Sequence, residues 1–273
     1  MTYDAPAIIF CATQRSGSTM IVDDFQNATG RPSSQTDSFY HLALTKGVEN
    51  WTQAFSIVQR HRAGEAVFFD KVMFSIVLKL SDMIAPNGAP NRTAPFAKFF
   101  AKAVWVYIRR ANIFEQTVSK YTAEELDVWD ASKAGEDFNA AMDFDIHQAR
   151  KHMRGFIKED AQWMAFFKRH GITPIQIYYE DAVPNFPTYL APVLAAAGLD
   201  FDLVNLRPRR KQKLGNARSA VLANVLESMV QRDLIAQMFK ARGAQGTAEP
   251  ERRPNSIASP WRPDHGRRCL HSG

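Results

Sequence analysis

The sequence predicts an α/β domain in which a central parallel sheet is flanked by helices. Short apolar runs alternate with segments of helical periodicity along most of the chain. Residues 8–20 are typical of a buried strand, a turn of small residues and the start of a helix. The 273 residues suffice for one large domain. We expect this domain over residues 1–242 and a disordered tail over 243–273, where Pro, Arg, Gly and Ser are frequent.

The composition is that of an ordinary globular protein, with 45% hydrophobic and 23% charged residues. The two cysteines, Cys11 and Cys269, are too few for a disulfide framework or a cysteine-based zinc site. The sequence shows neither a signal-peptide pattern nor a stretch long enough to span a membrane, so we expect a soluble, cytoplasmic protein. The net charge is +6, and basic residues concentrate between Arg207 and Arg218, which favours a polyanionic ligand.

The turn after the first apolar run has the residues of an anion-binding loop. Ser16, Gly17, Ser18 and Thr19 supply backbone freedom and hydroxyl groups, and Arg15 adds a positive charge. A helix that begins near Ser18 would direct its unpaired N–H groups and the positive end of its dipole toward a bound anion. Gly-Lys occurs nowhere in the sequence, so the loop is not that of an ATP-hydrolysing P-loop protein.

The next elements are predicted from apolar periodicity and turn residues. The first helix runs to Thr29, because Ile21, Phe25 and Ala28 share one face and Gly30 can end it. Four segments follow: a surface loop over 30–40, a weak helical pattern over 41–63, a buried strand over 66–69 that places Lys71 at its carboxyl end, and an apolar helix over 74–80. A loop over 86–95 comes next.

Residues 103–108 form the clearest strand, apolar on both faces and therefore central. It ends in Arg109-Arg110. Asn112 can cap the next helix with Glu115 at the third position, and Ser119 lies two turns along the same side as Asn112. The remaining elements are a helix over 145–170, a strand over 172–178, a turn at Glu180 and Asp181, a helix over 186–197 and a last helix over 217–241.

The segment Gln14 to Thr19 resembles the 5′-phosphosulfate loop of a bacterial sulfotransferase family, typified by trehalose 2-sulfotransferase. Its members use 3′-phosphoadenosine 5′-phosphosulfate (PAPS) as donor. Further matches follow in the family's order: Gly30-Arg31-Pro32, Lys71-Val72-Met73, Arg110 with Gln116-Thr117-Val118-Ser119, Tyr179-Glu180-Asp181, and Lys211-Gln212. The resemblance implies a P-loop-like, three-layer fold and the transfer of a sulfuryl group to a hydroxyl of a carbohydrate or glycolipid. It also leads us to expect a homodimer.

The resemblance assigns roles to individual residues. It implies that the 5′-phosphosulfate is bound by the loop, Gln14, Arg15, Ser16, Gly17, Ser18 and Thr19. Arg110 and Ser119 would bind the 3′-phosphate, and Lys211 and Gln212 would belong to a basic loop at the donor. Arg15 and the loop backbone would stabilise the charge that grows on the departing oxygen, and Lys71 would lie across the transferring group. The seven histidines show no metal-binding spacing, so no metal is expected.

The general base is where the sequence departs from the family. The acceptor hydroxyl loses a proton as it attacks, which calls for a base within hydrogen-bonding reach. The family has a glutamate two residues after the proline of the Gly-x-Pro segment, and this chain has Ser34 there. A serine cannot serve as that base. Asp37 is the replacement candidate, although an aspartate that forms a turn is an equally good interpretation.

Three other interpretations use parts of the same sequence. Because of Ser34, the chain could bind PAPS without catalysing transfer, and turnover would distinguish the two cases. A nucleic-acid-binding protein could use the basic segment 207–218, but no interleaved aromatic residues accompany it. Asp143-Phe144-Asp145 matches the Asp-x-Asp of metal-dependent glycosyltransferases, yet three such residues at the start of a charged helix occur by chance.

Overall fold

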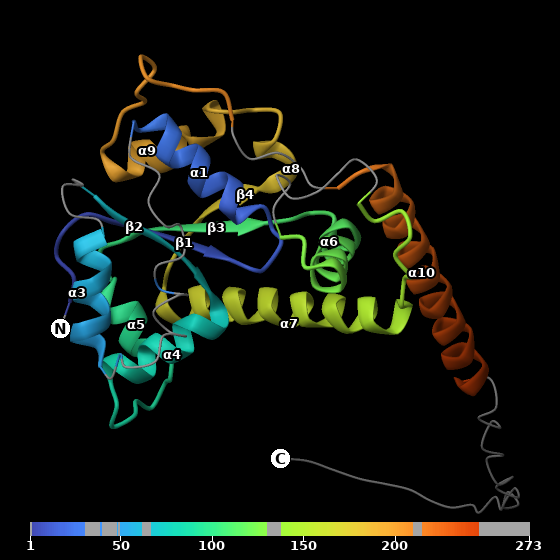
Figure 1. The fold of residues 1–273 in the computed structure, drawn as a ribbon. Coiled ribbons are helices and arrows are strands. Elements are labelled where there is room, and N and C mark those ends of the chain that lie inside the picture. Colours follow the sequence, from blue (N-terminus) through green and yellow to red (C-terminus); the bar gives the residue numbers. More distant parts are fainter. Residues whose placement is uncertain are drawn as a thin grey trace, which may run out of the picture. The chain divides into compact units, whose positions relative to one another are not determined.

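The computed structural model describes residues 2–30, 39, 48, 50–61, 67–129, 138–209 and 215–245 (Figure 1). The chain divides into two compact units, Met1–Met229 and Val230–Gly273. The first unit contains the sheet and the helices packed on it. In the second, the described residues continue the last helix, α10 (Ala217–Gln245).

The sheet has four parallel strands in the order β2-β1-β3-β4. Their bounds are Ala7–Ala12 for β1, Phe68–Met73 for β2, Val104–Arg109 for β3 and Ile175–Tyr178 for β4. All six residues of β1 are buried, as expected for an inner strand covered on both faces. In the register of the sheet, Phe10 lies opposite Lys71 and Val106. Because the strands are parallel, their carboxyl ends meet at one edge.

Helices cover both faces of this sheet (Figure 1). Besides α10, the helices in the described residues are α1 (Ser18–Ala28), α3 (Trp51–His61), α4 (Phe74–Ile84), α5 (Ala94–Phe99), α6 (Ile113–Leu126), α7 (Ile146–His170), α8 (Tyr179–Ala182), a 3₁₀ turn (Thr188–Leu190) and α9 (Ala191–Ala197). One hydrophobic core lies between the sheet and α3, α4, α5 and α7. The other lies between the sheet and α1, α8 and α9. The predicted three-layer α/β fold with a central parallel sheet is therefore confirmed.

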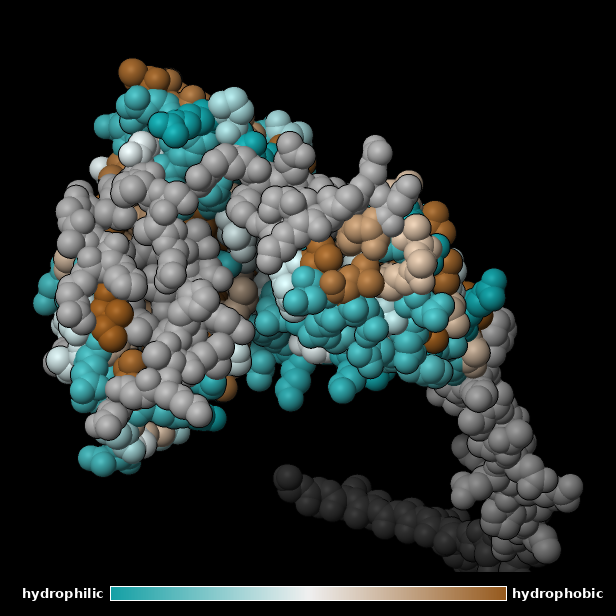
Figure 2. All heavy atoms as spheres, in the orientation of Figure 1, coloured by the Kyte–Doolittle hydropathy of each residue, from teal (hydrophilic) through white to brown (hydrophobic). Residues whose placement is uncertain are grey.

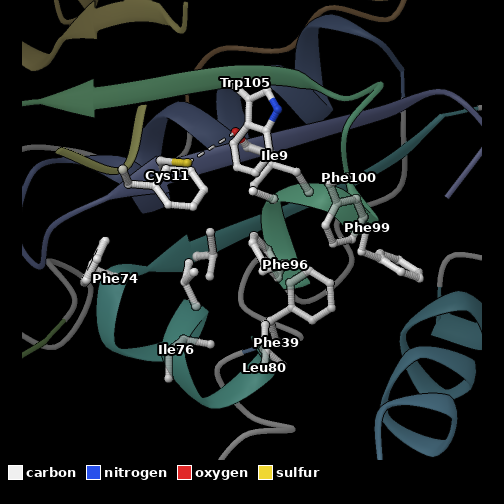
Figure 3. Close-up of a cluster of buried hydrophobic side chains, with 14 of the residues drawn as sticks. Ile9, Cys11, Phe39, Phe74, Ile76, Leu80, Phe96, Phe99, Phe100 and Trp105 are labelled. Carbon is white, nitrogen blue, oxygen red and sulfur yellow. Dashed lines mark hydrogen bonds between the residues drawn. The ribbon is translucent and has the colours of Figure 1, made fainter. Parts of the chain in front are cut away.

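The side chains of β1 alternate between the two cores. Ile9 and Cys11 enter the first, which is rich in aromatic rings, whereas Ile8 and Phe10 enter the second. Figure 3 shows Ile9 and Cys11 above a cluster that includes Phe96, Phe99 and Phe100. Desolvation by burial raises the pKa of the Cys11 thiol well above its usual value, which fits a structural and unreactive cysteine.

The predicted Asn112 cap is present, as are glycines at helix ends, and α7 has a cap that was not predicted. The Asn112 side chain accepts a hydrogen bond from the Glu115 N–H, 2.9 Å away, at the start of α6. Asp145 caps α7 by accepting bonds from two backbone N–H groups, which gives one aspartate of the Asp-x-Asp sequence a structural role. Gly171 and Gly198 end their helices with φ of 64° and 65°. These left-handed values are unfavourable for residues with a Cβ.

Several boundaries differ from the prediction. β2 extends to Met73, so Lys71 lies inside the strand and not at its end; the polar pair before Val72 suggested a strand end, but both side chains are buried. β4 begins at Ile175 and not at 172, since Pro174 has no N–H to donate to a ladder. Helix α5 overlaps the predicted loop because Pro95 stands in its first turn, where proline is accepted.

Figure 2 shows hydrophilic side chains over the visible part of α7, and hydrophobic ones on α10, where Val221 and Val225 are exposed. Among the described residues, no helix combines the length and the hydropathy needed to cross a lipid bilayer.

Candidate functional site

The connection from β1 to α1 lies at the carboxyl edge of the sheet. Arg15 and Gly17 both have left-handed backbones, with φ of 60° and 84°, so the chain reverses within a few residues before α1 begins. The first turn of α1 contains no acidic residue, and its N-cap, Gly17, makes no side-chain cap bond. Backbone N–H groups in the first turn of a helix have no acceptor within the helix. This helix end can therefore bind an anion.

Two residues of other elements hold the loop in place. The buried amide of Gln116 on α6 donates to the Thr13 hydroxyl at 2.8 Å and to the Gln14 carbonyl at 2.7 Å. The ring of Tyr179 on α8 packs against Gly17 so closely that a Cβ there would lie 2.1 Å from the ring. Only glycine fits this position. These two contacts were not predicted from the sequence, although both residues lie within matched motifs.

The side chain of Arg15 extends toward α6. Its Nε donates to the Ser119 hydroxyl at 3.0 Å, and its Nη1 donates to the Trp129 carbonyl at 3.0 Å. The structure thus joins two residues that the sequence assigned to different phosphates of the donor. The loop residue Arg15 therefore contacts Ser119, one of the two residues predicted to bind the 3′-phosphate.

Arg110 lies beside the same loop and is largely buried, with 7% of its side chain exposed. Its Nη2 forms an ion pair of 2.7 Å with Glu115, and its Nη1 donates to the Arg15 carbonyl at 3.3 Å. Its Nε is 3.8 Å from Glu180, and its guanidinium carbon is 4.8 Å from the centre of the Tyr179 ring. A buried arginine requires such partners, since an unpaired charge is costly to desolvate.

The neighbouring Arg109 points to the other face of the sheet. It pairs with Asp160 on α7 at 3.0 Å and donates to the Tyr178 hydroxyl at 3.0 Å. Successive side chains of a strand alternate between faces, so only one of the two arginines at the end of β3 can face the loop. That residue is Arg110.

Lys71 is buried in β2, and its ammonium group donates to the Thr19 hydroxyl at 2.9 Å. Thr19 is itself exposed in the first turn of α1. The ammonium group is thus held at the opening of the helix, even though Lys71 lies within the strand. The strand, the helix and the loop together place Lys71 and Arg15 around one helix N-terminus.

Two serines complete the described part of the loop. Ser18 is buried at the start of α1, and Ser16 is fully buried. Within the described part of the chain, the Ser16 hydroxyl has no hydrogen-bond partner. A buried hydroxyl without a partner is costly, so this group is suited to a bound ligand. Predicted site residues Asp37, Lys211 and Gln212 lie outside the described residues, as does Ser34.

Arg209 lies at the start of the predicted basic segment and binds to α1. It forms an ion pair of 2.7 Å with the buried carboxylate of Asp24, which also accepts a 2.7 Å hydrogen bond from the Tyr189 hydroxyl. Burial raises the pKa of Asp24, and the hydrogen bonds from Arg209 and Tyr189 oppose this rise. The charge of Arg209 is therefore balanced within the protein. This arginine is an anchor, although the sequence grouped it with ligand-binding charges.

A cavity of about 820 Å³ lies at the opposite edge of the sheet, near the amino ends of β3 and β4. Its walls are mainly apolar and include Ala103, Trp105, Ile172 and Ile175. The loop, Lys71 and Arg110 all lie toward the carboxyl edge. This cavity is therefore separate from the candidate site.

Comparison with known proteins gives the family. Trehalose 2-sulfotransferase of Mycobacterium tuberculosis is 25% identical over 223 residues, which cover 69% of this chain and 83% of that enzyme. Two solved structures at 14% identity are the sulfotransferase domain from the curacin biosynthetic pathway (TM-score 0.47; 80% of this chain and 83% of that one) and that of the Synechococcus PCC 7002 olefin synthase (TM-score 0.43; 84% and 89%). The family model described as Stf0 sulphotransferase matches residues 55–224, more than half of the sequence. The chain therefore belongs to the Stf0 sulfotransferase family.

Proposed function

We propose that this protein transfers a sulfuryl group from PAPS to a hydroxyl of a carbohydrate or glycolipid. The observation that carries this proposal is the set of cations around the start of α1. Arg15 is part of the loop and donates to Ser119 on α6, Arg110 donates to the Arg15 carbonyl, and Lys71 donates to the Thr19 hydroxyl in the first helical turn. Family membership supports sulfuryl transfer, and the name of the mycobacterial relative supports a sugar as acceptor.

The donor would bind with its 5′-phosphosulfate over the loop. The N–H groups at the start of α1, together with Ser16, Ser18 and Thr19, would hydrogen-bond the anion there. Arg110 and Ser119 would bind the 3′-phosphate, which distinguishes PAPS from ATP. Lys211 and Gln212 are proposed to complete the donor site from the basic segment.

The chemical step needs charge stabilisation and a base. The acceptor oxygen forms a bond to sulfur while the bond from sulfur to the bridging oxygen of the donor breaks, and the electron pair stays on the 5′-phosphate. Lys71 and Arg15 would stabilise the charge that grows on that oxygen. The acceptor proton would pass to a base, for which Asp37 is our hypothesis because Ser34 replaces the family glutamate.

Calorimetric titration tests the donor half of the proposal. We expect 3′-phosphoadenosine 5′-phosphate (PAP), the desulfated product, to bind at micromolar concentration and ADP to bind far more weakly, because the two ligands differ chiefly in the place of the second phosphate. Arg110→Ala should remove the preference for PAP. If wild type binds neither ligand, the proposed donor site is wrong.

Turnover tests the catalytic half. Radiolabelled PAPS is incubated with a panel of sugars and glycolipids, and transfer is followed for wild type and Asp37→Asn. A strong loss of rate in the variant supports Asp37 as base, and an unchanged rate rejects it.

The alternative function, a PAPS-binding protein without catalysis, rests on Ser34 and predicts PAP binding with no transfer to any acceptor. Light scattering after gel filtration tests the proposed homodimer.

A further inference from the structure

The ring of Tyr179 contacts both parts of the proposed donor site. On the loop side, the ring is so close to Gly17 that a Cβ would lie 2.1 Å from its Cδ2 and 2.8 Å from its Cε2. On the α6 side, the guanidinium of Arg110 lies 4.8 Å from the ring centre. The ring is buried, with 7% of the residue exposed. One rigid aromatic side chain therefore contacts both the loop and Arg110.

The next residue, Glu180, fixes the chain that follows Arg110. Its two carboxylate oxygens accept hydrogen bonds from the backbone N–H groups of Ala111 at 2.9 Å and Asn112 at 3.2 Å. One of these oxygens is also 3.8 Å from the Nε of Arg110. Glu180 thus holds the connection between β3 and α6, and its charge lies beside the Arg110 Nε, which has no hydrogen-bond partner among the described residues.

The remaining contacts of Arg110 complete this arrangement. Its Nη2 pairs with Glu115 and its Nη1 donates to the Arg15 carbonyl in the loop. The guanidinium is therefore confined by the ring and a carboxylate of α8, by a carboxylate of α6 and by the loop itself. Such confinement lowers the entropic cost of placing a charge on a ligand.

We infer that Tyr179 and Glu180 are positioning residues that set the distance between the binding sites for the two phosphate groups of the donor. This inference rests on the proposed function. PAP carries its phosphates on the 3′ and 5′ oxygens of one ribose, so their separation is nearly fixed. A site that holds Arg110 at the matching distance binds PAP well. ADP carries both phosphates on the 5′ oxygen, so the position of Arg110 does not increase its affinity.

The test compares PAP and ADP by calorimetry in Tyr179→Leu, Tyr179→Phe and Glu180→Gln. We expect Tyr179→Leu and Glu180→Gln to weaken PAP binding about tenfold, the effect of misplacing one charge-assisted hydrogen bond, with much less change for ADP. Tyr179→Phe keeps the ring and should behave as wild type. Tyr178→Leu is the matched control, because the neighbouring Tyr178 contacts Arg109 and not Arg110.

The outcomes separate this inference from the proposed function. Thermal unfolding first verifies that each variant is folded; Glu180 has 35% of its side chain exposed, so its substitution is the milder one. If wild type prefers PAP and Arg110→Ala loses that preference, the donor site stands. If folded Tyr179→Leu and Glu180→Gln then keep the wild-type ratio of PAP to ADP affinity, or lose both affinities equally, the positioning role is wrong.

Discussion

Gly17→Ala should destabilise the protein considerably more than Gly88→Ala. Both glycines have φ of 84°, but a Cβ at Gly17 would lie 2.1 Å from Tyr179, whereas nothing lies within 4 Å of one at Gly88. A left-handed backbone costs an L-residue about 1–2 kcal/mol. Overpacking adds about 1–3 kcal/mol. The expected loss in the free energy of unfolding is therefore about 1–2 kcal/mol for Gly88→Ala and about 2–5 kcal/mol for Gly17→Ala.

Urea unfolding followed by circular dichroism measures both losses. A double variant, Gly17→Ala with Tyr179→Ala, removes the overlapping ring and should recover about 1–3 kcal/mol relative to the sum of the single changes. The slope of the free energy against urea should stay constant across the set, which shows that the denatured state is unchanged. Equal losses for the two glycine variants would refute the claim that Tyr179 confines the loop.

Three further predictions concern charged side chains. Lys71→Ala should lower kcat about 10²–10³-fold with little change in the Kd for PAP, as measured by labelled sulfuryl transfer and calorimetry, and an unchanged kcat would contradict its role. Burial raises the pKa of Glu159 above its ordinary 4.5, so its carboxyl group holds a proton more tightly in the folded than in the unfolded protein. The free energy of unfolding therefore falls as pH rises from 4.5 through the folded pKa. Glu159→Gln should remove this loss, and urea unfolding at pH 4.5 and 7.5 checks whether its advantage over wild type grows with pH; a constant difference argues against the shift. Arg209→Leu leaves the buried carboxylate of Asp24 without its ion-pair partner, with only the hydrogen bond from Tyr189, and should cost about 3–5 kcal/mol. The exposed Arg92→Leu serves as its control, because Arg92 forms a surface ion pair with Asp82; similar losses for both variants would show that the Asp24 pair is not an anchor.

The elements with strong local signals could be predicted from the sequence. The apolar run 103–108 became β3 within one or two residues of its expected ends, and the helix over 145–170 became α7 with Gly171 at its end. These signals are local: apolar periodicity sets the buried face, and caps set the ends. The Asn112 cap was predicted for the same reason.

The contacts within the candidate site could not be predicted in the same way. Arg15, which donates to Ser119, has a left-handed backbone, and an arginine in a sequence does not indicate that conformation. The packing of Tyr179 on Gly17 joins residues far apart in the chain, so it depends on the whole sheet. Lys71 was expected near the loop, but its buried position inside β2 follows from a register that only tertiary structure fixes.

The hydrogen bond between Arg15 and Ser119 also determines whether the serine hydroxyl is available as a donor or as an acceptor. Because the Arg15 Nε donates to the Ser119 oxygen, that oxygen already serves as an acceptor, and its own hydrogen is left to be donated. A hydroxyl held in this state selects for a partner rich in lone pairs. In the proposed donor complex, Ser119 would therefore donate this hydrogen to an oxygen of the 3′-phosphate.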